Sequence, residues 1–278
     1  MSYQTIQQIV NGLSLDKLAK VPFHKRIPTS VPTQYRPHSY WQGEGVPVVG
    51  TVPTNGKANG RVCTNSTDGA VLGIPANAYL ASSSVGQQTS SSATGTLMLV
   101  DRISDINLNH NEATGSLTGL DATSRLATGA GAHIWIEAIT TLGASSNTFT
   151  LTYTNQDGTG SRTTPNIVTI GSAIQGKSVL TNAAYTFAPL QDGDVGVRSI
   201  QSITLVSGSS TGTMLISLVR PLVTWLIPAI GYGSNREELF SATPLPAISS
   251  SACLSFLWFP FSAAGMGISA GCLNFITD

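Results

Sequence analysis

A long middle stretch, residues 96–221, consists of short apolar and β-branched runs separated by clusters of Gly, Ser, Asn and Asp. Runs of four to eight such residues predict β-strands, and the clusters between them are typical of turns. Many short strands at close spacing indicate a sandwich or barrel. We therefore expect an all-β fold, an antiparallel, jelly-roll-like β-sandwich over residues 46–278. The clearest strand candidates are residues 96–100, 133–139, 148–153, 167–170 and 199–206.

Charged residues are scarce in this chain. They make up 10% of its 278 residues, against roughly 25% in an ordinary soluble domain. The formal net charge is zero, and net charge is what keeps protein molecules apart in solution. Composition thus favours a subunit of an assembly, including a homo-oligomer, over a freely diffusing monomer.

Residues 1–45 differ from the rest of the chain. Ile6, Ile9 and Leu13 recur at helical spacing and predict a short helix over residues 2–18. Six prolines between residues 22 and 53 then argue against a regular helix or a central strand, and predict an extended arm. The arm is too apolar to lie in water without purpose, so we expect it to contact a neighbouring subunit. The predicted interface residues are Ile6, Ile9, Leu13, Phe23, Tyr35, Tyr40 and Trp41.

Five of the 14 Lys and Arg residues lie before residue 40, three of them in the arm and two just before it. A basic segment can contact nucleic acid or an acidic protein surface. Here the charges are spread out and interrupted by prolines, which favours a protein neighbour over nucleic acid.

The loop expectations follow from composition. Residues 81–95 are rich in Ser, Thr, Gln and Gly and predict a long mobile loop. Residues 156–159 contain an Asp-Gly pair, which favours a hairpin turn.

Residues 214–230 and 254–276 are apolar enough to resemble membrane spans, but Pro, Gly and Arg interrupt them, so we expect buried strands and no membrane contact.

The nearest approach to a metal motif is the segment that holds Asp192 and Asp194. Alternating Asp and Gly can bring oxygens together around calcium. The segment lacks the further carboxylates of a calcium loop, and an Asp-Gly turn explains it as well. We therefore expect neither a metal nor a cofactor; Asp192 and Asp194 are the candidates should a metal bind.

Candidate catalytic groups are few. His133, Trp135 and Glu137 fall on one face of a predicted strand, where a His and a Glu could act as ligand and base. We expect this face to meet solvent or another subunit instead. Asp101, Arg102 and Asp105 are expected to form a surface ion pair in a loop. With no nucleophile elbow and no phosphate-binding glycine loop, we predict no catalytic residue.

The three cysteines, Cys63, Cys253 and Cys272, have neither metal-site spacing nor a disulfide pattern. Free buried thiols are expected, and a Cys253–Cys272 bridge is the alternative. The first residues lack the basic and apolar regions of a secretory signal.

Several short segments of the sequence resemble a group of virion structural proteins of tailed bacteriophages. These segments are residues 6–12, 97–101, 151–156, 192–203 and 218–222, and residues 96–222 are the most similar part. The resemblance implies a particle component of the head and brings no active-site residues.

We therefore expect a structural virion protein, a minor or decoration protein that reinforces the head shell by contacts with the major capsid protein or other virion subunits. Two alternatives stay open. One is a tail or fibre adhesin that binds a host glycan, and the other is a carbohydrate-active enzyme with two carboxylates in a cleft.

Overall fold

The computed structural model describes residues 17–26, 35–65, 68–71, 73–88, 94–181, 186–228, 233–237, 245–261 and 268–277. Over these residues the fold is all-β, every ladder between named strands is antiparallel, and no helix is present. The predicted fold class and the antiparallel pairing are therefore confirmed.

The described strands form three sheets, which we call A, B and C. Sheet A has the order β14-β5-β17-β1-β3, and β15 also pairs with β5. Its strands are β14 (Gly233–Glu237), β5 (Ala78–Gln88), β17 (Ile268–Thr277), β1 (Leu18–Arg26), β3 (Gly45–Val46) and β15 (Ala247–Ile248).

Sheet B has the order β2-β16-β6-β13-β8, and β4 also pairs with β6. Its strands are β2 (His38–Ser39), β16 (Leu254–Pro260), β6 (Gly95–Asn109), β13 (Thr213–Ile227), β8 (His133–Ala138) and β4 (Arg61–Val62). Sheet C has the order β10-β9-β12-β7, with β11 also paired to β9. Its strands are β10 (Arg162–Thr163), β9 (Thr148–Asn155), β12 (Val197–Ser207), β7 (Gly115–Ser116) and β11 (Ile167–Val168).

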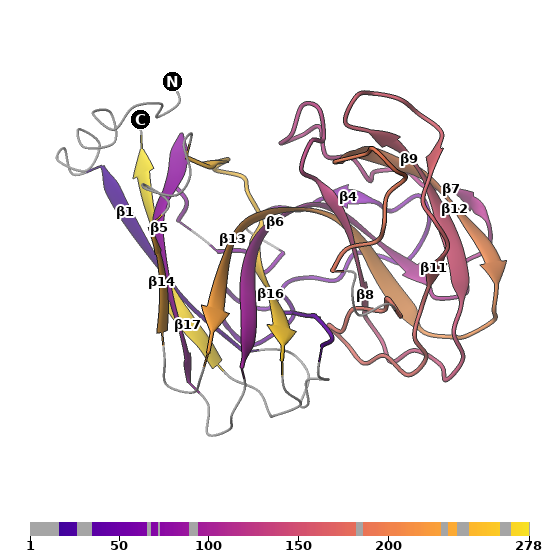
Figure 1. The fold of residues 1–278 in the computed structure, drawn as a ribbon, viewed down its shortest axis with the longest axis horizontal. Helices are drawn as coiled ribbons and strands as arrows, with labels where there is room; N and C mark the ends of the chain where they lie inside the picture. The colour runs from indigo at the N-terminus through magenta and orange to yellow at the C-terminus, as the bar shows by residue number, and fades with distance from the viewer. Residues whose placement is uncertain are drawn as a thin grey trace.

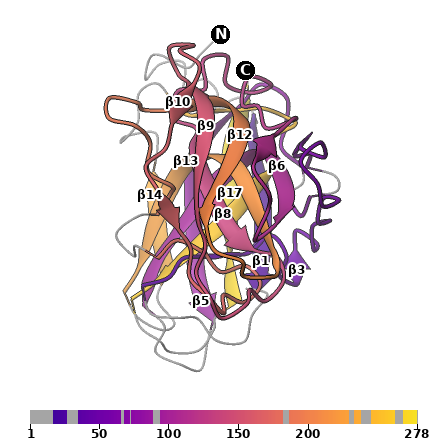
Figure 2. The same ribbon diagram turned by 90° about the vertical axis from the view of Figure 1, so that its right-hand side faces the viewer.

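The long strands β6 and β13 connect the two halves of the molecule. They pair over their whole length, with register shifts between Leu218 and Val219 and between Pro221 and Val223. Such bulges bend a strand pair. In Figure 1 the pair arches across the molecule, with sheet A at one end and sheet C at the other. Figure 2 looks onto β9 and β12 of sheet C.

One face of the β6–β13 pair contributes to two hydrophobic cores. Leu97 and Leu99 of β6 pack with sheet A, whereas Ile106 and Leu108 of the same strand pack with sheet C. On β13, Trp225 belongs to the first core. We call the half with sheet A the A lobe and the half with sheet C the C lobe. The structure thus has two packed sandwiches that share sheet B, and the strand order does not support a jelly roll.

The described part of the N-terminal segment is not an independent arm. β1 pairs with β17 at nine consecutive positions and with β3 at two. Val21 and Phe23 are buried in the core of the A lobe. The expectation that proline excludes a central strand is wrong at Pro22. This residue is exposed and lies outside the two positions of β1 that pair with β3, so its missing N–H breaks no ladder on that side. The predicted helix lies outside the described residues except for Lys17 and Leu18, and Leu18 begins β1.

The expected mobile loop over residues 81–95 is wrong over Ala81–Gln88, which belong to β5. A Ser-rich segment forms a strand here because β17 and β14 pair with it on its two sides. Inside the core, Ser83 Oγ accepts a hydrogen bond of 3.1 Å from Trp225 Nε1. Tertiary pairing overrides the weak strand propensity of serine.

The two membrane-like windows are strands wherever they are described, as expected. Residues 214–227 belong to β13, and the second window contains β16 and most of β17. Among the described ranges, no helix has the length and apolar character needed to cross a membrane.

The packing of β1 generates a stability prediction. The Phe23 ring lies 4.4 Å from the Phe256 ring between centroids and is 3% exposed. Phe23→Ala should lower the free energy of unfolding by roughly 3–5 kcal/mol, because it opens a cavity in the A lobe. Leu18→Ala, at a 38% exposed position of the same strand, should change it by less than about 1 kcal/mol. Urea denaturation measures both; equal effects would contradict the placement of β1.

Candidate functional site

Charged side chains gather where β6 passes from one lobe to the other. We call this set the junction network, and define it as Arg61, Asp68, Asp101, Arg102, Asp105 and Arg125.

Two arginines share Asp105, which is fully buried. Arg102 Nη2 lies 2.5 Å from Asp105 Oδ2, and Arg61 Nε lies 3.1 Å from Asp105 Oδ1. Arg61 also reaches Asp68 through a 2.6 Å contact between Nη2 and Oδ1. These contacts tie β4 and the segment that follows it to the middle of β6.

Arg125 completes the network from the loop after β7. Its Nη1 donates to Asp101 Oδ1 at 2.5 Å and to the Arg102 carbonyl at 2.6 Å, and its Nη2 donates to the Cys63 carbonyl. Burial raises the pKa of Asp101, and the neighbouring Arg125 opposes that rise. The Asp101 carboxylate also accepts a hydrogen bond from the Cys253 amide.

Arg102 also lies near a fourth buried carboxylate, that of Glu137. The Arg102 guanidinium carbon lies 4.1 Å from the centroid of the Trp41 ring, within cation–π range. Trp41 Nε1 donates a hydrogen bond to Glu137 Oε1. Burial raises the pKa of Glu137, and hydrogen bonds from Ser39 and Trp41 and the charge of Arg102 oppose the rise.

The network acts as a set of buried ion pairs. Each of the three aspartates is paired with an arginine. Complete buried ion pairs add little net stability. Removing one partner leaves an unpaired charge in the interior and lowers the free energy of unfolding strongly. The arrangement therefore fixes how β4, β6 and the Arg125 loop fit together.

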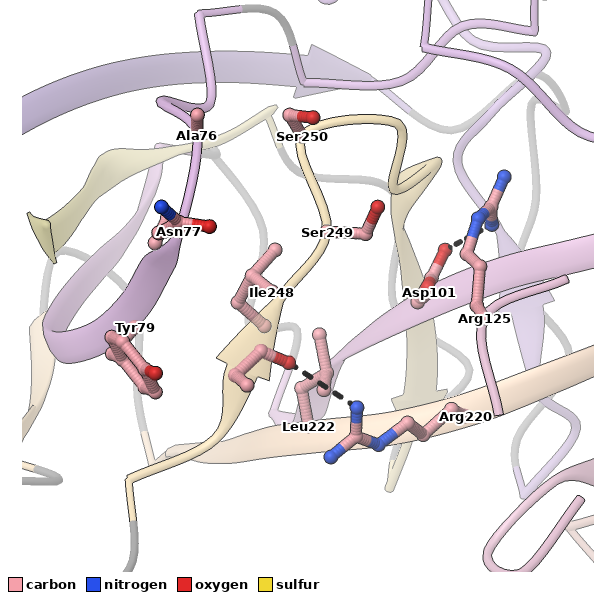
Figure 3. A pocket seen from close by; sticks show the side chains of 12 residues that line it. Ala76, Asn77, Tyr79, Asp101, Arg125, Arg220, Leu222, Ile248, Ser249 and Ser250 are labelled. Atoms are coloured by element: carbon pink, nitrogen blue, oxygen red, sulfur yellow. Dashed lines mark hydrogen bonds and ion pairs between the residues drawn. The ribbon is translucent and has the colours of Figure 1, made fainter. Parts of the chain in front are cut away.

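The interlobe cleft lies beside this network (Figure 3). It has a volume of about 370 Å³ and is lined by residues of both lobes. Asp101 and Arg220 are paired across β6 and β13 and lie between the two cores. Arg220 Nη1 donates to the Ala247 carbonyl at 3.3 Å. The other lining residues are Ala76, Asn77, Ala78, Tyr79, Arg125, Leu222, Ala247, Ile248, Ser249 and Ser250.

The cleft offers one accessible cation and several neutral polar groups. Arg220 is only partly buried, whereas Arg125 is 4% exposed and held by Asp101. An adjoining hollow, also of about 370 Å³, continues past Arg220 along Pro221 and Pro246. The cleft and the adjoining hollow together have room for a small group beside Arg220, whose positive charge would favour a hydroxylated or anionic one.

The metal candidates Asp192 and Asp194 lie in a turn at the end of the C lobe. Asp194 accepts hydrogen bonds from Tyr153 Oη at 2.5 Å, Asn155 Nδ2 at 2.8 Å and Arg162 Nε at 2.9 Å. Although burial acts to raise it, these donors lower the pKa of Asp194 to about 2. Asp192 is exposed and only its carbonyl is bonded, to Arg162. No cluster of three or more His, Cys, Asp or Glu suited to a metal occurs in the described part of the chain.

His133 and Glu137 do not form a common site. His133 stacks on Phe187 with 4.8 Å between ring centroids, whereas Glu137 is buried against Trp41 at the far end of β8. The expectation that this strand face meets solvent is wrong, because Trp135 and Glu137 are both buried.

The expected surface ion pair of Asp101, Arg102 and Asp105 is also wrong. These residues lie within β6 and are buried. The apolar alternation at Ile106 and Leu108 was the available signal that the strand continues beyond the charged positions, although a register shift changes its phase there.

The predicted interface residues divide into three groups. Phe23, Tyr40 and Trp41 are buried within this chain, so they are not anchors on a neighbour. Tyr35 is 59% exposed and has a φ of 58°, a costly conformation for a bulky residue. Ile6, Ile9 and Leu13 lie outside the described residues.

Comparison with known proteins yields only weak structural likeness. No protein-family model and no curated protein matches the sequence. The crystal structure of the infectious bursal disease virus VP2 subviral particle is similar at 8% identity and a TM-score of 0.20, over 94% of this chain and 80% of that chain. At this level the likeness carries no argument about fold or function.

The junction network can be tested by breaking one pair. Arg102→Met should lower the free energy of unfolding by roughly 3–5 kcal/mol, because it leaves Asp105 with only one arginine in a buried site. The control is Arg26→Met, which removes an exposed 3.8 Å pair with Glu44 and should cost about 1 kcal/mol or less. Chemical denaturation compares the two; a loss no larger than the control's would show that the network does not hold the junction.

The turn at Asp194 predicts an acid-dependent loss of stability. Because the folded-state pKa of about 2 lies below the unfolded value of about 4, the carboxylate stabilises the fold above pH 4, and this contribution is lost as the pH falls through 2. Asp194→Asn should lower Tm at pH 7, and the difference from wild type should shrink toward pH 2. Asp192→Asn should leave Tm unchanged, as should a chelator. A chelator-induced drop reversed by calcium would overturn the turn interpretation.

Proposed function

We propose that this protein is a structural component of a tailed-phage particle, a minor or decoration protein that stabilises the head shell. The resemblance of residues 96–222 to phage virion proteins supports this proposal, as does an all-β scaffold braced by buried ion pairs. The observation that carries it is the nature of the exposed surface.

Burial withdraws some of the chain's few charged side chains from the surface. At least six charged side chains are buried, and they are taken from a total of only 14 Lys and Arg and 14 Asp and Glu. The six are Lys25, Asp68, Asp101, Arg102, Asp105 and Glu137. A surface with little charge repels copies and partners weakly, which favours stable packing in a shell.

Aliphatic side chains are exposed at the edge of sheet A. Val46, Val48 and Val49 are 57%, 64% and 52% exposed, and Val46 belongs to the edge strand β3. Lys25 Nζ donates to the carbonyls of Gly43 and Val48, which fixes the backbone beneath these side chains. We call residues 46–49 the valine edge. An apolar sheet edge whose backbone is fixed by hydrogen bonds is suited to burial against a neighbouring subunit.

The valine edge yields the test of this proposal. The double variant Val48→Asp, Val49→Asp should reduce the protein's copy number in purified particles by roughly tenfold or more, since two charges would be buried in the contact. Its Tm should stay close to wild type because both positions are exposed.

The matched control is Val206→Asp, a 53% exposed position on β12 of the C lobe. It should join particles at the wild-type level. Normal occupancy of the double variant would contradict the valine edge as the contact. A wild-type copy number in proportion to the shell subunit supports a head protein, and a handful of copies would place the protein in the tail instead.

Binding of a host glycan is the second candidate function, and the interlobe cleft favours it. Asn77, Ser249 and Ser250 provide polar groups near Arg220. A glycan array probed with wild type and Arg220→Ala tests this candidate: signals that depend on Arg220 support an adhesin, and an array without signals excludes one.

A further inference from the structure

Cys63 and Cys253 meet at the facing ends of two short strands. The Cys63 amide donates to the Ile103 carbonyl at 2.9 Å, and the Arg102 amide donates to the Cys253 carbonyl at 3.0 Å. Because Arg102 and Ile103 are consecutive, β4 and β16 lie end to end along the same edge of β6. The two cysteines therefore occupy neighbouring positions in space although they are far apart in the sequence.

The side chains of this pair are also in contact. Both are 0% exposed and share a small buried cluster with Ala70, and the two thiols lie within hydrogen-bonding reach. Burial and the hydrogen bond to Cys253 raise the pKa of the Cys63 thiol well above its usual range, and Arg102 opposes the rise. Both cysteines are thiols in this structure.

We propose that Cys63 and Cys253 are a modification site, at which oxidation forms a disulfide that joins β4 to β16 across the junction of the two lobes. The expected alternative partner, Cys272, is not placed for this reaction. It lies on β17 of sheet A and its thiol faces Asn274 Oδ1 at 3.5 Å.

A small-molecule disulfide, such as oxidised glutathione, is the oxidant that completes the reaction. When local opening of the junction exposes the pair, the thiolate of one cysteine attacks this oxidant, forms a mixed disulfide and releases one glutathione thiol. The second cysteine then attacks the mixed disulfide, forms the Cys63–Cys253 bond and releases the second thiol. Two S–H bonds of the protein are lost, and their hydrogens and electrons leave with the two glutathione molecules.

The bond would stabilise the junction of the two lobes. β4 pairs with the part of β6 that continues into the C lobe, and β16 pairs with the part that belongs to the A lobe. A disulfide between residues so far apart in sequence restricts the unfolded chain strongly. The junction would thus be held by non-covalent contacts alone in a reducing compartment and gain a covalent link after release into an oxidising one. This inference does not depend on the proposed function.

The experiment compares the purified full chain after incubation with reduced or oxidised glutathione. Oxidation should lower the intact mass by two hydrogens and yield a Cys63–Cys253 linked peptide in a non-reducing digest. It should raise Tm by roughly 5–10 °C. Cys272→Ala should behave as wild type, whereas Cys63→Ala should lose both the linked peptide and the rise in Tm.

The peptide map of the wild-type protein decides the outcome even if a cysteine variant fails to fold. A link that contains Cys272 would overturn the proposal, as would oxidised protein in which Cys63 and Cys253 both still react with an alkylating reagent after unfolding. Virion occupancy is not part of this readout, so failure here leaves the valine edge unaffected.

Discussion

Both hydrophobic cores depend on the ladder between β6 and β13. Each strand is 15 residues long and contributes apolar side chains to the A lobe at one end and to the C lobe at the other. In the middle the same face carries Asp101 and Arg220 instead. Bulges at this point bend the pair, so two compact sandwiches can share one sheet. Without the continuous ladder neither core would have its second layer.

The middle of the ladder is also where the chain concentrates its charge. Arg102 and Asp105 would each be costly to bury alone, but the pairings with Arg61, Asp68 and Trp41 satisfy them. The buried network thus contains charged side chains that would otherwise lie at the surface. Hydroxyl, amide and aliphatic groups therefore make up much of the exterior.

The positions of the strands could be predicted from the sequence far better than the pairing between strands. Residues 133–138, 148–155 and 254–260 alternate or run apolar over strand lengths, and all are strands. β5 was mistaken for a loop, because its strand character comes from pairing with β17 and β14, which lie far along the chain. The burial of Arg102 could not be read from local pattern either, since its partners Trp41, Asp105 and the thiols of Cys63 and Cys253 are mostly distant in sequence. The turn that begins at Asp192 was correctly predicted because an Asp-Gly pair favours a turn by itself, whereas the hydrogen bonds of Asp194 to Tyr153, Asn155 and Arg162 depend on tertiary contacts.

The topology of sheet A has a consequence for synthesis of the chain. β17, the last of the described strands, lies between β1 and β5, which are among the first. The C lobe, in contrast, is built from residues within one continuous stretch of the chain, about 103–218. A ribosome can therefore release a complete C lobe while β1 and β5 still lack the strand that separates them. β5 is rich in serine and β1 carries Lys20, Lys25 and Arg26, which are residue types that disfavour pairing of exposed strand edges between chains.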